Sequence, residues 1–126
     1  MTRLGCLALV LLAVSCGAQH IKLSKLDSSR ACLRAAGART DERLGGDFIA
    51  GTATGGAFKA HLDRNYVTVV FSDTVDDADA INDAYHRFHA RNVGIEDVLK
   101  QHGNVVMLWH SHPSDAAQAR VIGCLK

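Results

Sequence analysis

The sequence of 126 residues predicts an α+β fold: a small antiparallel sheet with helices packed on one of its faces, in a two-layer sandwich. Three observations predict it. Segments with helical periodicity stand near both ends and in the middle of the chain, a hairpin pattern lies between the first two of them, and each terminal helical segment carries one cysteine. The expected order is α–β–β–α–β–α, or an equivalent with an extra edge strand, in a single domain at residues 25–126.

The first expected helix covers residues 25–37, with the sequence KLDSSRACLRAAG. Its apolar residues recur at near-helical spacing, and Gly37 supplies a left-handed stop. The stretch that follows, residues 40–56, is polar and rich in glycine, so it predicts a long loop with a weak strand at residues 48–52.

Residues 57–71 predict a β-hairpin. Apolar and polar residues alternate in AFKAHL, a turn follows at DRN, and the next run, YVTVVF, is rich in β-branched and aromatic residues. Residues 72–92 then predict the longest helix, because three acids stand near its positive N-terminal end and two arginines near its other end. The residues expected on its buried face are Val75, Ala78, Ile81, Tyr85 and Phe88.

The last third of the chain predicts a short helix, a strand and a final helix. GIEDVLKQHG indicates a short amphipathic helix or turn at residues 95–101. NVVMLWHS, residues 104–111, is continuously apolar, which is typical of a strand that is central or covered on both faces. The last helix is expected to begin after the capping residue Ser114 and to carry Cys124 near its end.

The first twenty residues, MTRLGCLALVLLAVSCGAQH, have the pattern of a bacterial export signal: a basic residue, an apolar run and then small residues. Two cleavage modes compete. A serine followed by Cys16 resembles the lipoprotein site, so residues 1–15 would be removed, Cys16 would be lipidated and attach the protein to a membrane, and residues 16–24 would form a linker. Alternatively, removal of residues 1–18 by ordinary cleavage would release a soluble secreted or periplasmic protein.

Four cysteines lead to a structural expectation. Cys6 leaves with the signal, and Cys16 is either lipidated or removed, so both cleavage modes leave Cys32 and Cys124 in an oxidising compartment. A disulfide between them would close most of the domain into one loop and stabilise the fold by roughly 4–5 kcal/mol in the chain-entropy model. The alternative is a pair of buried free thiols.

Charge excludes some partners. The chain carries 14 basic and 13 acidic residues, and removal of the signal with Arg3 leaves these in balance. Because no basic run is present, we expect no binding to nucleic acid. No stretch after the signal is apolar enough for a transmembrane helix in the mature chain. The sequence identifies no partner beyond the membrane that a lipid on Cys16 would enter.

Seven histidines suggest an alternative function, the binding of a metal. His110 and His112 project from the same side of the expected strand, since side chains alternate, and His89 lies at the boundary of the long helix's buried face. Imidazole ligands suit Zn or Cu. This alternative is an extracellular metal-binding protein that uses His110 and His112 with His89, or with His61 in place of His89. If the protein instead has a non-enzymatic binding or structural role, no cofactor is expected.

The tetrapeptide HSHP, residues 110–113, resembles the metal-binding signature of the JAMM/MPN+ metalloproteases, in which two histidines and a downstream aspartate hold zinc. The resemblance implies a truncated metalloprotease as a remote alternative. By the spacing of that family an aspartate should stand near residues 120–123, where the sequence reads RVIG, and no acid follows Asp115. We therefore interpret the match as accidental.

Over most of its length the chain is similar to short, uncharacterised exported proteins and lipoproteins of bacteria. The likeness is carried by the export signal, by ACLRAAG in the first helix, by LWHSHP at the end of the last strand and by GCLK. It implies an exported location and a fold type, and it transfers no functional residues. Because no residues converge on a catalytic pattern, the predicted function is a non-enzymatic binding or structural role.

Overall fold

The computed structural model describes residues 22–89 and 94–126, and of His89 it describes the backbone alone. The fold is α+β, as the sequence predicts, with a five-stranded sheet in the order β1-β2-β3-β5-β4. Every neighbouring pair of strands is antiparallel. The strands are β1 (Arg39–Asp41), β2 (Ala57–Leu62), β3 (Asn65–Phe71), β4 (Leu99–His102) and β5 (Val105–Trp109).

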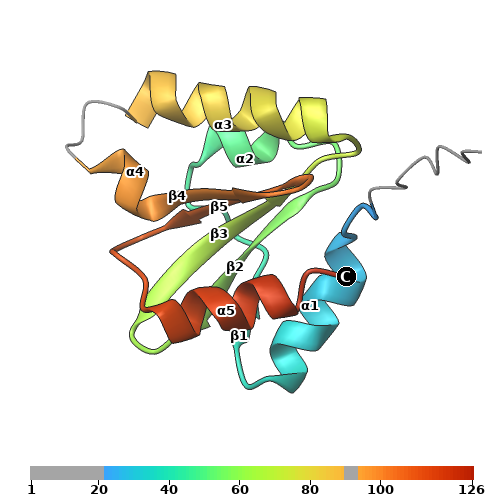
Figure 1. Cartoon of the computed structure of the whole chain (residues 1–126), viewed down its shortest axis with the longest axis vertical. Coiled ribbons are helices and arrows are strands. Elements are labelled where there is room, and N and C mark those ends of the chain that lie inside the picture. The colour runs from blue at the N-terminus through green and yellow to red at the C-terminus, as the bar shows by residue number, and fades with distance from the viewer. Residues whose placement is uncertain (1–21, 90–93) are drawn as a thin grey trace, which may run out of the picture.

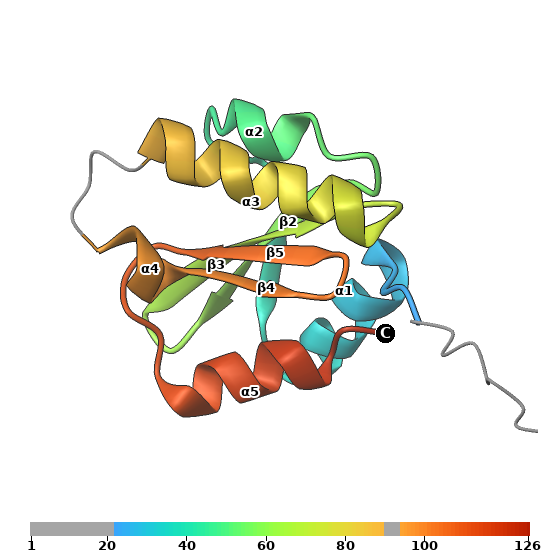
Figure 2. The same cartoon turned by 45° about the horizontal axis from the view of Figure 1, so that its top comes forward.

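Helices cover both faces of this sheet, as Figures 1 and 2 show. On one face lie α1 (Leu26–Ala35) and α5 (Asp115–Gly123), and on the other lie α2 (Phe48–Gly51) and α3 (Val75–His89). The short helix α4 (Ile95–Val98) precedes β4 directly. The two-layer arrangement predicted from the sequence, with all helices on one face, is therefore wrong: the molecule has three layers.

Helices cover both faces of the sheet because of the composition of its central strands. Residues 67–71 of β3 are all buried, and so are all residues of β5 except Leu108, which is half-buried. Successive side chains of a strand point to opposite faces, so a continuously apolar strand needs cover on both sides. Phe71 and Met107 pack toward α1 and α5, whereas Val70 and Val106 pack toward α2 and α3.

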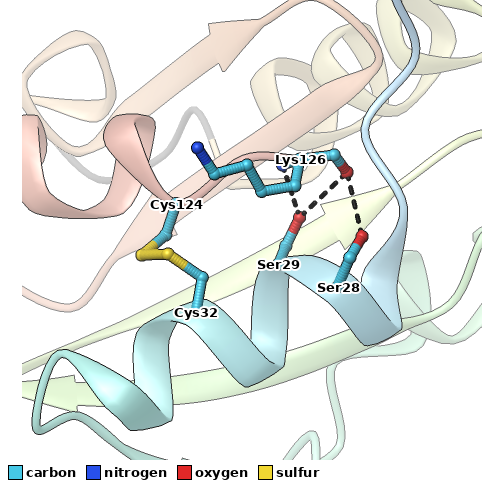
Figure 3. Close-up of a disulfide and its surroundings, with 5 residues drawn as sticks. All are labelled: Ser28, Ser29, Cys32, Cys124 and Lys126. Atoms are coloured by element: carbon cyan, nitrogen blue, oxygen red, sulfur yellow. Dashed lines mark hydrogen bonds between the residues drawn. A yellow bond between two sulfur atoms is a disulfide. The ribbon is translucent and has the colours of Figure 1, made fainter.

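The predicted disulfide is confirmed. Cys32 in α1 and Cys124 at the end of α5 are bonded, with 5.3 Å between their Cα atoms and a sequence separation of 92 (Figure 3). The bridge makes the first and last described helices neighbours on the same face of the sheet. Because disulfides persist in oxidising compartments, it indicates that the folded domain resides in one.

Two expected elements differ in type. Residues 48–52 were expected to form a strand, but the structure has helix α2 there, begun by Asp47, whose side chain accepts a hydrogen bond from the N–H of Ala50. The expected short helix at residues 95–101 ends at Val98, and β4 follows at once. Both segments are too short for periodicity to decide between helix and strand.

One residue expected on the buried face of α3 is exposed. Val75 is half-buried, and Ala78, Ile81 and Tyr85 are buried as expected, but 59% of Phe88 is accessible. Phe88 packs edge-on against Phe48 of α2, with 5.7 Å between the ring centroids, because α2 lies beside α3. The two rings contact each other at the surface of the molecule.

The export signal, Cys6 and the expected lipidation site Cys16 lie outside the described residues. Of the linker expected at residues 16–24, the structure describes only 22–24. Within the described segments, none of the helices has the length and apolar character needed to cross a bilayer.

Candidate functional site

A cavity of about 530 Å³ opens on the face of the sheet that carries α2 and α3. Its floor is formed by strands β2, β3 and β5, one wall by the loop before α2, and another wall by α4. Cavities of 300–1,000 Å³, roughly, are typical of small-molecule sites in proteins. The volume is therefore suited to a small organic ligand.

The floor of the cavity follows from strand register. Lys59 of β2 stands opposite Thr68 of β3, and Thr68 stands opposite Leu108 of β5, so three side chains form a row across the sheet. Thr68 is 3% exposed, and its hydroxyl forms no hydrogen bond with the described residues. The buried polar side-chain atoms without a partner in the described residues are Ser72 Oγ and Trp109 Nε1. The Thr68 hydroxyl is not one of them, so it is accessible from the cavity that Thr68 lines.

A second row, one step along the strands, consists of rings. The ring of Tyr66 stacks on that of His110 with 4.5 Å between the centroids and 17° between the planes, and the centroid of His61 is 5.6 Å from that of Tyr66 on its other side. The backbone N–H of His110 donates to the carbonyl oxygen of Tyr66 at 2.9 Å, which extends the pairing of β3 and β5. Tyr66 and His110 both line the cavity.

The ammonium group of Lys59 lies inside this arrangement. Its Nζ is 4.9 Å from the centroid of the Tyr66 ring, a distance typical of a cation–π contact. On the loop side the ammonium group lies beside Gly45, where a Cβ atom would be only 2.8 Å from Nζ. Gly45 and Gly46 have φ values of +62° and +82°, which favour glycine and let the loop approach Lys59 closely.

Asp47 joins the cavity wall to the core. Its Oδ1 accepts from the N–H of Ala50 at 3.0 Å, and its Oδ2 accepts from the hydroxyl of Tyr85 at 2.7 Å. Burial, together with this bond to the carboxylate, raises the pKa of Tyr85 well above its usual range. The carboxylate therefore anchors α2 to α3, and both of its oxygens are engaged.

The opposite wall, α4, is tied to its surroundings by polar contacts. Ile95 and Val98 face the cavity. Glu96 lies 3.3 Å from Nε2 of His86 on α3, and its carbonyl oxygen accepts from Nζ of Lys100 at 2.9 Å. These contacts hold the short helix against α3 and β4.

The two predicted metal ligands whose side chains are described line different cavities. His110 lines the cavity described above, whereas His112 lines a smaller one of about 360 Å³ beside the turn of the hairpin. Strand β5 ends at Trp109, so the alternation expected to place His110 and His112 on the same side stops before them. The side chain of His89 lies outside the described residues. Among those described, no three His, Cys, Asp or Glu side chains are grouped to hold a metal ion.

Reasoning from the sequence missed Lys59, Tyr66 and Thr68. The available signal was the alternation in AFKAHL and NYVTVV, which places Lys59 and His61 on one face of β2, and Tyr66 and Thr68 on one face of β3. That face would have been identified as a site only with knowledge of which elements cover it.

Comparisons with models of protein families, with curated proteins and with solved structures found no match for this chain. The chemistry of the cavity must therefore be read from its own residues. Hydrogen-bond donors and one ammonium group border it on the sheet, and apolar side chains border it at Leu44, Phe48, Ile95, Val98 and Leu108. This combination can bind a ligand that has both a polar and an apolar part.

Proposed function

We propose that this chain is an exported domain, anchored by a lipid on Cys16, that binds a small ligand in the cavity on its sheet and catalyses no reaction. The observation that carries the binding role is the cavity itself, with the Thr68 hydroxyl in its floor, which has no hydrogen-bond partner among the described residues.

Two features support the exported location. The Cys32–Cys124 bridge is typical of proteins folded in oxidising compartments. The apolar opening segment, with a serine before Cys16, is typical of lipoproteins and would supply the attachment. Two acyl chains on one cysteine hold a protein on a membrane stably, which a single chain does not.

The engagement of Asp47 supports a binding role for that residue rather than acid–base chemistry. The polar groups of the site stand on paired strands, and the one carboxylate that lines it in the described part of the chain, Asp47, is bonded to Ala50 and Tyr85. A general base must reach the proton that it abstracts. Asp47 instead fixes the wall of a preformed site.

The anchor is tested by the intact mass of the mature protein from a bacterial membrane fraction. We expect a start at Cys16 with the added mass of the lipid, and loss of both the lipid and the membrane association in Cys16→Ser. An unmodified mature protein that starts at Gln19 would refute the anchor and leave the secreted form.

Binding is tested by screening a library of small charged and neutral molecules against isotope-labelled protein by NMR. We expect hits that shift the amide resonances of Gly45, Gly46 and Thr68, and that are lost in Thr68→Phe, which fills the floor of the cavity. Retention of the Cys32–Cys124 bridge and of the remaining spectrum serves as the folding control. A library without hits in this cavity would refute the binding role.

A further inference from the structure

We infer that the cavity selects a small monocarboxylate with an apolar body, and that the ammonium group of Lys59 pairs with the carboxylate. This inference rests on the proposed binding role and names its ligand class. It is carried by the placement of Lys59, by the charges around it and by the division of the cavity into a polar and an apolar part.

Lys59 is the cation of the cavity. It forms no ion pair with any carboxylate of the described residues, and it is half-buried between the Gly45 loop and the Tyr66 ring. A lysine on a sheet surface normally extends its ammonium group into water, where the group is strongly hydrated. Here the group is held at the cavity, and the ring face replaces only part of its hydration.

Lys59 has charges of both signs nearby. Its register partner on β1 is Asp41, whose carboxylate accepts from the N–H of Arg43 and lies 3.9 Å from the Arg43 side chain. Burial lowers the pKa of His61 on the same strand as Lys59, and the charges of Arg39 and Lys59 lower it further, against an opposing effect of Asp41. Asp47, whose oxygens accept from Ala50 and Tyr85, is the acid that borders the cavity within the described residues. In the cavity lining, an incoming anion therefore meets a cation without an ion-pair partner, and a carboxylate whose two oxygens are both engaged.

Donors stand next to the cation. The Thr68 hydroxyl is in the neighbouring register position to Lys59, and the Tyr66 hydroxyl has no hydrogen-bond partner among the described side chains and backbone. A carboxylate accepts several hydrogen bonds through two oxygens, so an ammonium group with adjacent hydroxyls suits it. A dianion such as phosphate carries two negative charges, so more than one cation in the cavity would be needed to neutralise it.

The apolar part lies beyond the donors. Leu108 forms the floor next to Thr68, and Leu44, Phe48 and Ile95 border the cavity from its walls. Phe48 is 64% exposed, so its ring has free area for a ligand to cover. An aromatic or aliphatic body attached to the carboxylate would bury this surface, and burial of apolar area is favourable by roughly 25 cal/mol per Å².

The experiment compares matched pairs of probes by NMR titration at neutral pH: phenylacetate with phenylacetamide, and octanoate with octanamide. We expect each carboxylate to bind at least about tenfold more tightly than its neutral amide, with shifts at Gly45, Gly46 and Thr68. In Lys59→Gln the preference should fall below about twofold, Lys59→Arg should keep most of it, and Lys25→Gln, on the other face of the sheet, should leave it unchanged.

The outcomes separate the ligand class from the binding role. Equal affinity for acid and amide, or a preference that survives in Lys59→Gln, overturns the carboxylate inference while the cavity remains a binding site. Stronger binding of inorganic phosphate than of either carboxylate overturns it as well. Absence of binding by these probes, together with library hits that are all neutral, overturns the inference and leaves the proposed function standing.

Discussion

Ser29 and Lys126 are hydrogen-bonded to each other although 97 positions separate them in the sequence. The N–H of Lys126 donates to the Ser29 hydroxyl at 3.0 Å, and that hydroxyl lies 3.5 Å from the carbonyl oxygen of Lys126 (Figure 3). The same carbonyl accepts from the backbone N–H of Lys25 and from the hydroxyl of Ser28. Lys25 provides no side-chain cap for α1, and the segment after α5 supplies the acceptor for the backbone N–H of this residue.

This contact predicts that replacement of two neighbouring serines by alanine changes the free energy of unfolding by different amounts. Ser29 is fully buried, whereas Ser28 is exposed. Ser29→Ala removes the acceptor of the Lys126 N–H and should lower the free energy of unfolding by about 1–2 kcal/mol. Ser28→Ala should change it by less than about 0.5 kcal/mol, because water replaces the lost bond. Urea unfolding of both variants measures this, and equal effects would contradict the role of Ser29.

Reduction of the Cys32–Cys124 bridge should lower the free energy of unfolding by about 4–5 kcal/mol, because it releases a loop of 92 residues in the unfolded chain. The measurement is urea unfolding with and without a reductant. A variant with both cysteines replaced by alanine provides the control, since the reductant should not change its stability. A loss of less than about 1 kcal/mol in the native protein would show that the bridge stabilises little.

Loss of the Tyr85 hydroxyl should lower the free energy of unfolding more than loss of the Tyr66 hydroxyl. Tyr85→Phe removes the donor to Oδ2 of Asp47 and should lower the free energy of unfolding by about 2 kcal/mol. Tyr66→Phe keeps the ring that stacks on His110 and removes a hydroxyl without a partner in the described residues, so we expect a change below about 0.5 kcal/mol. Thermal or urea unfolding compares the two, and a larger loss in Tyr66→Phe would contradict the assignment.

The contact between His86 and Glu96 predicts a pH dependence of stability. The nearby carbonyl oxygen of Asn82 raises the pKa of His86, as do Glu96 and Asp83, against an opposing effect of burial. Because the folded pKa lies above the unfolded value of about 6.5, protonation of His86 favours the fold. The stabilisation is complete below that unfolded value and is lost as the pH rises through the folded pKa.

Unfolding free energies of the native protein and of His86→Gln, measured between about pH 5 and pH 9, test this. The advantage of the native protein should be largest at the acidic end and should shrink toward the alkaline end. In Glu96→Gln the pKa of His86, followed by NMR, should fall. If the difference in unfolding free energy between the native protein and His86→Gln grew with pH, protonation of His86 would not favour the fold.

Local signals in the sequence were sufficient for the larger elements and failed for the short ones. Helices α1, α3 and α5 and the β2–β3 hairpin were predicted because periodicity, caps and turn residues act within a few positions of each other. The four residues of α2 and the four of β4 are too few for a period, so their type depends on their neighbours. Asp47, which caps α2, was the one local signal available there.

The amino-acid pattern alone predicted the Cys32–Cys124 pair and a continuously apolar last strand, since both depend on counts and patterns along the chain, but it placed all helices on one face of the sheet. Only the tertiary structure decided which helix covers which face, and hence where the sheet is left open. The cavity brings Gly45, Lys59, Thr68, Ile95 and His110 together from separate segments, and no local pattern links them. Their proximity is produced by strand pairing and helix packing, which are interactions between residues far apart in the sequence.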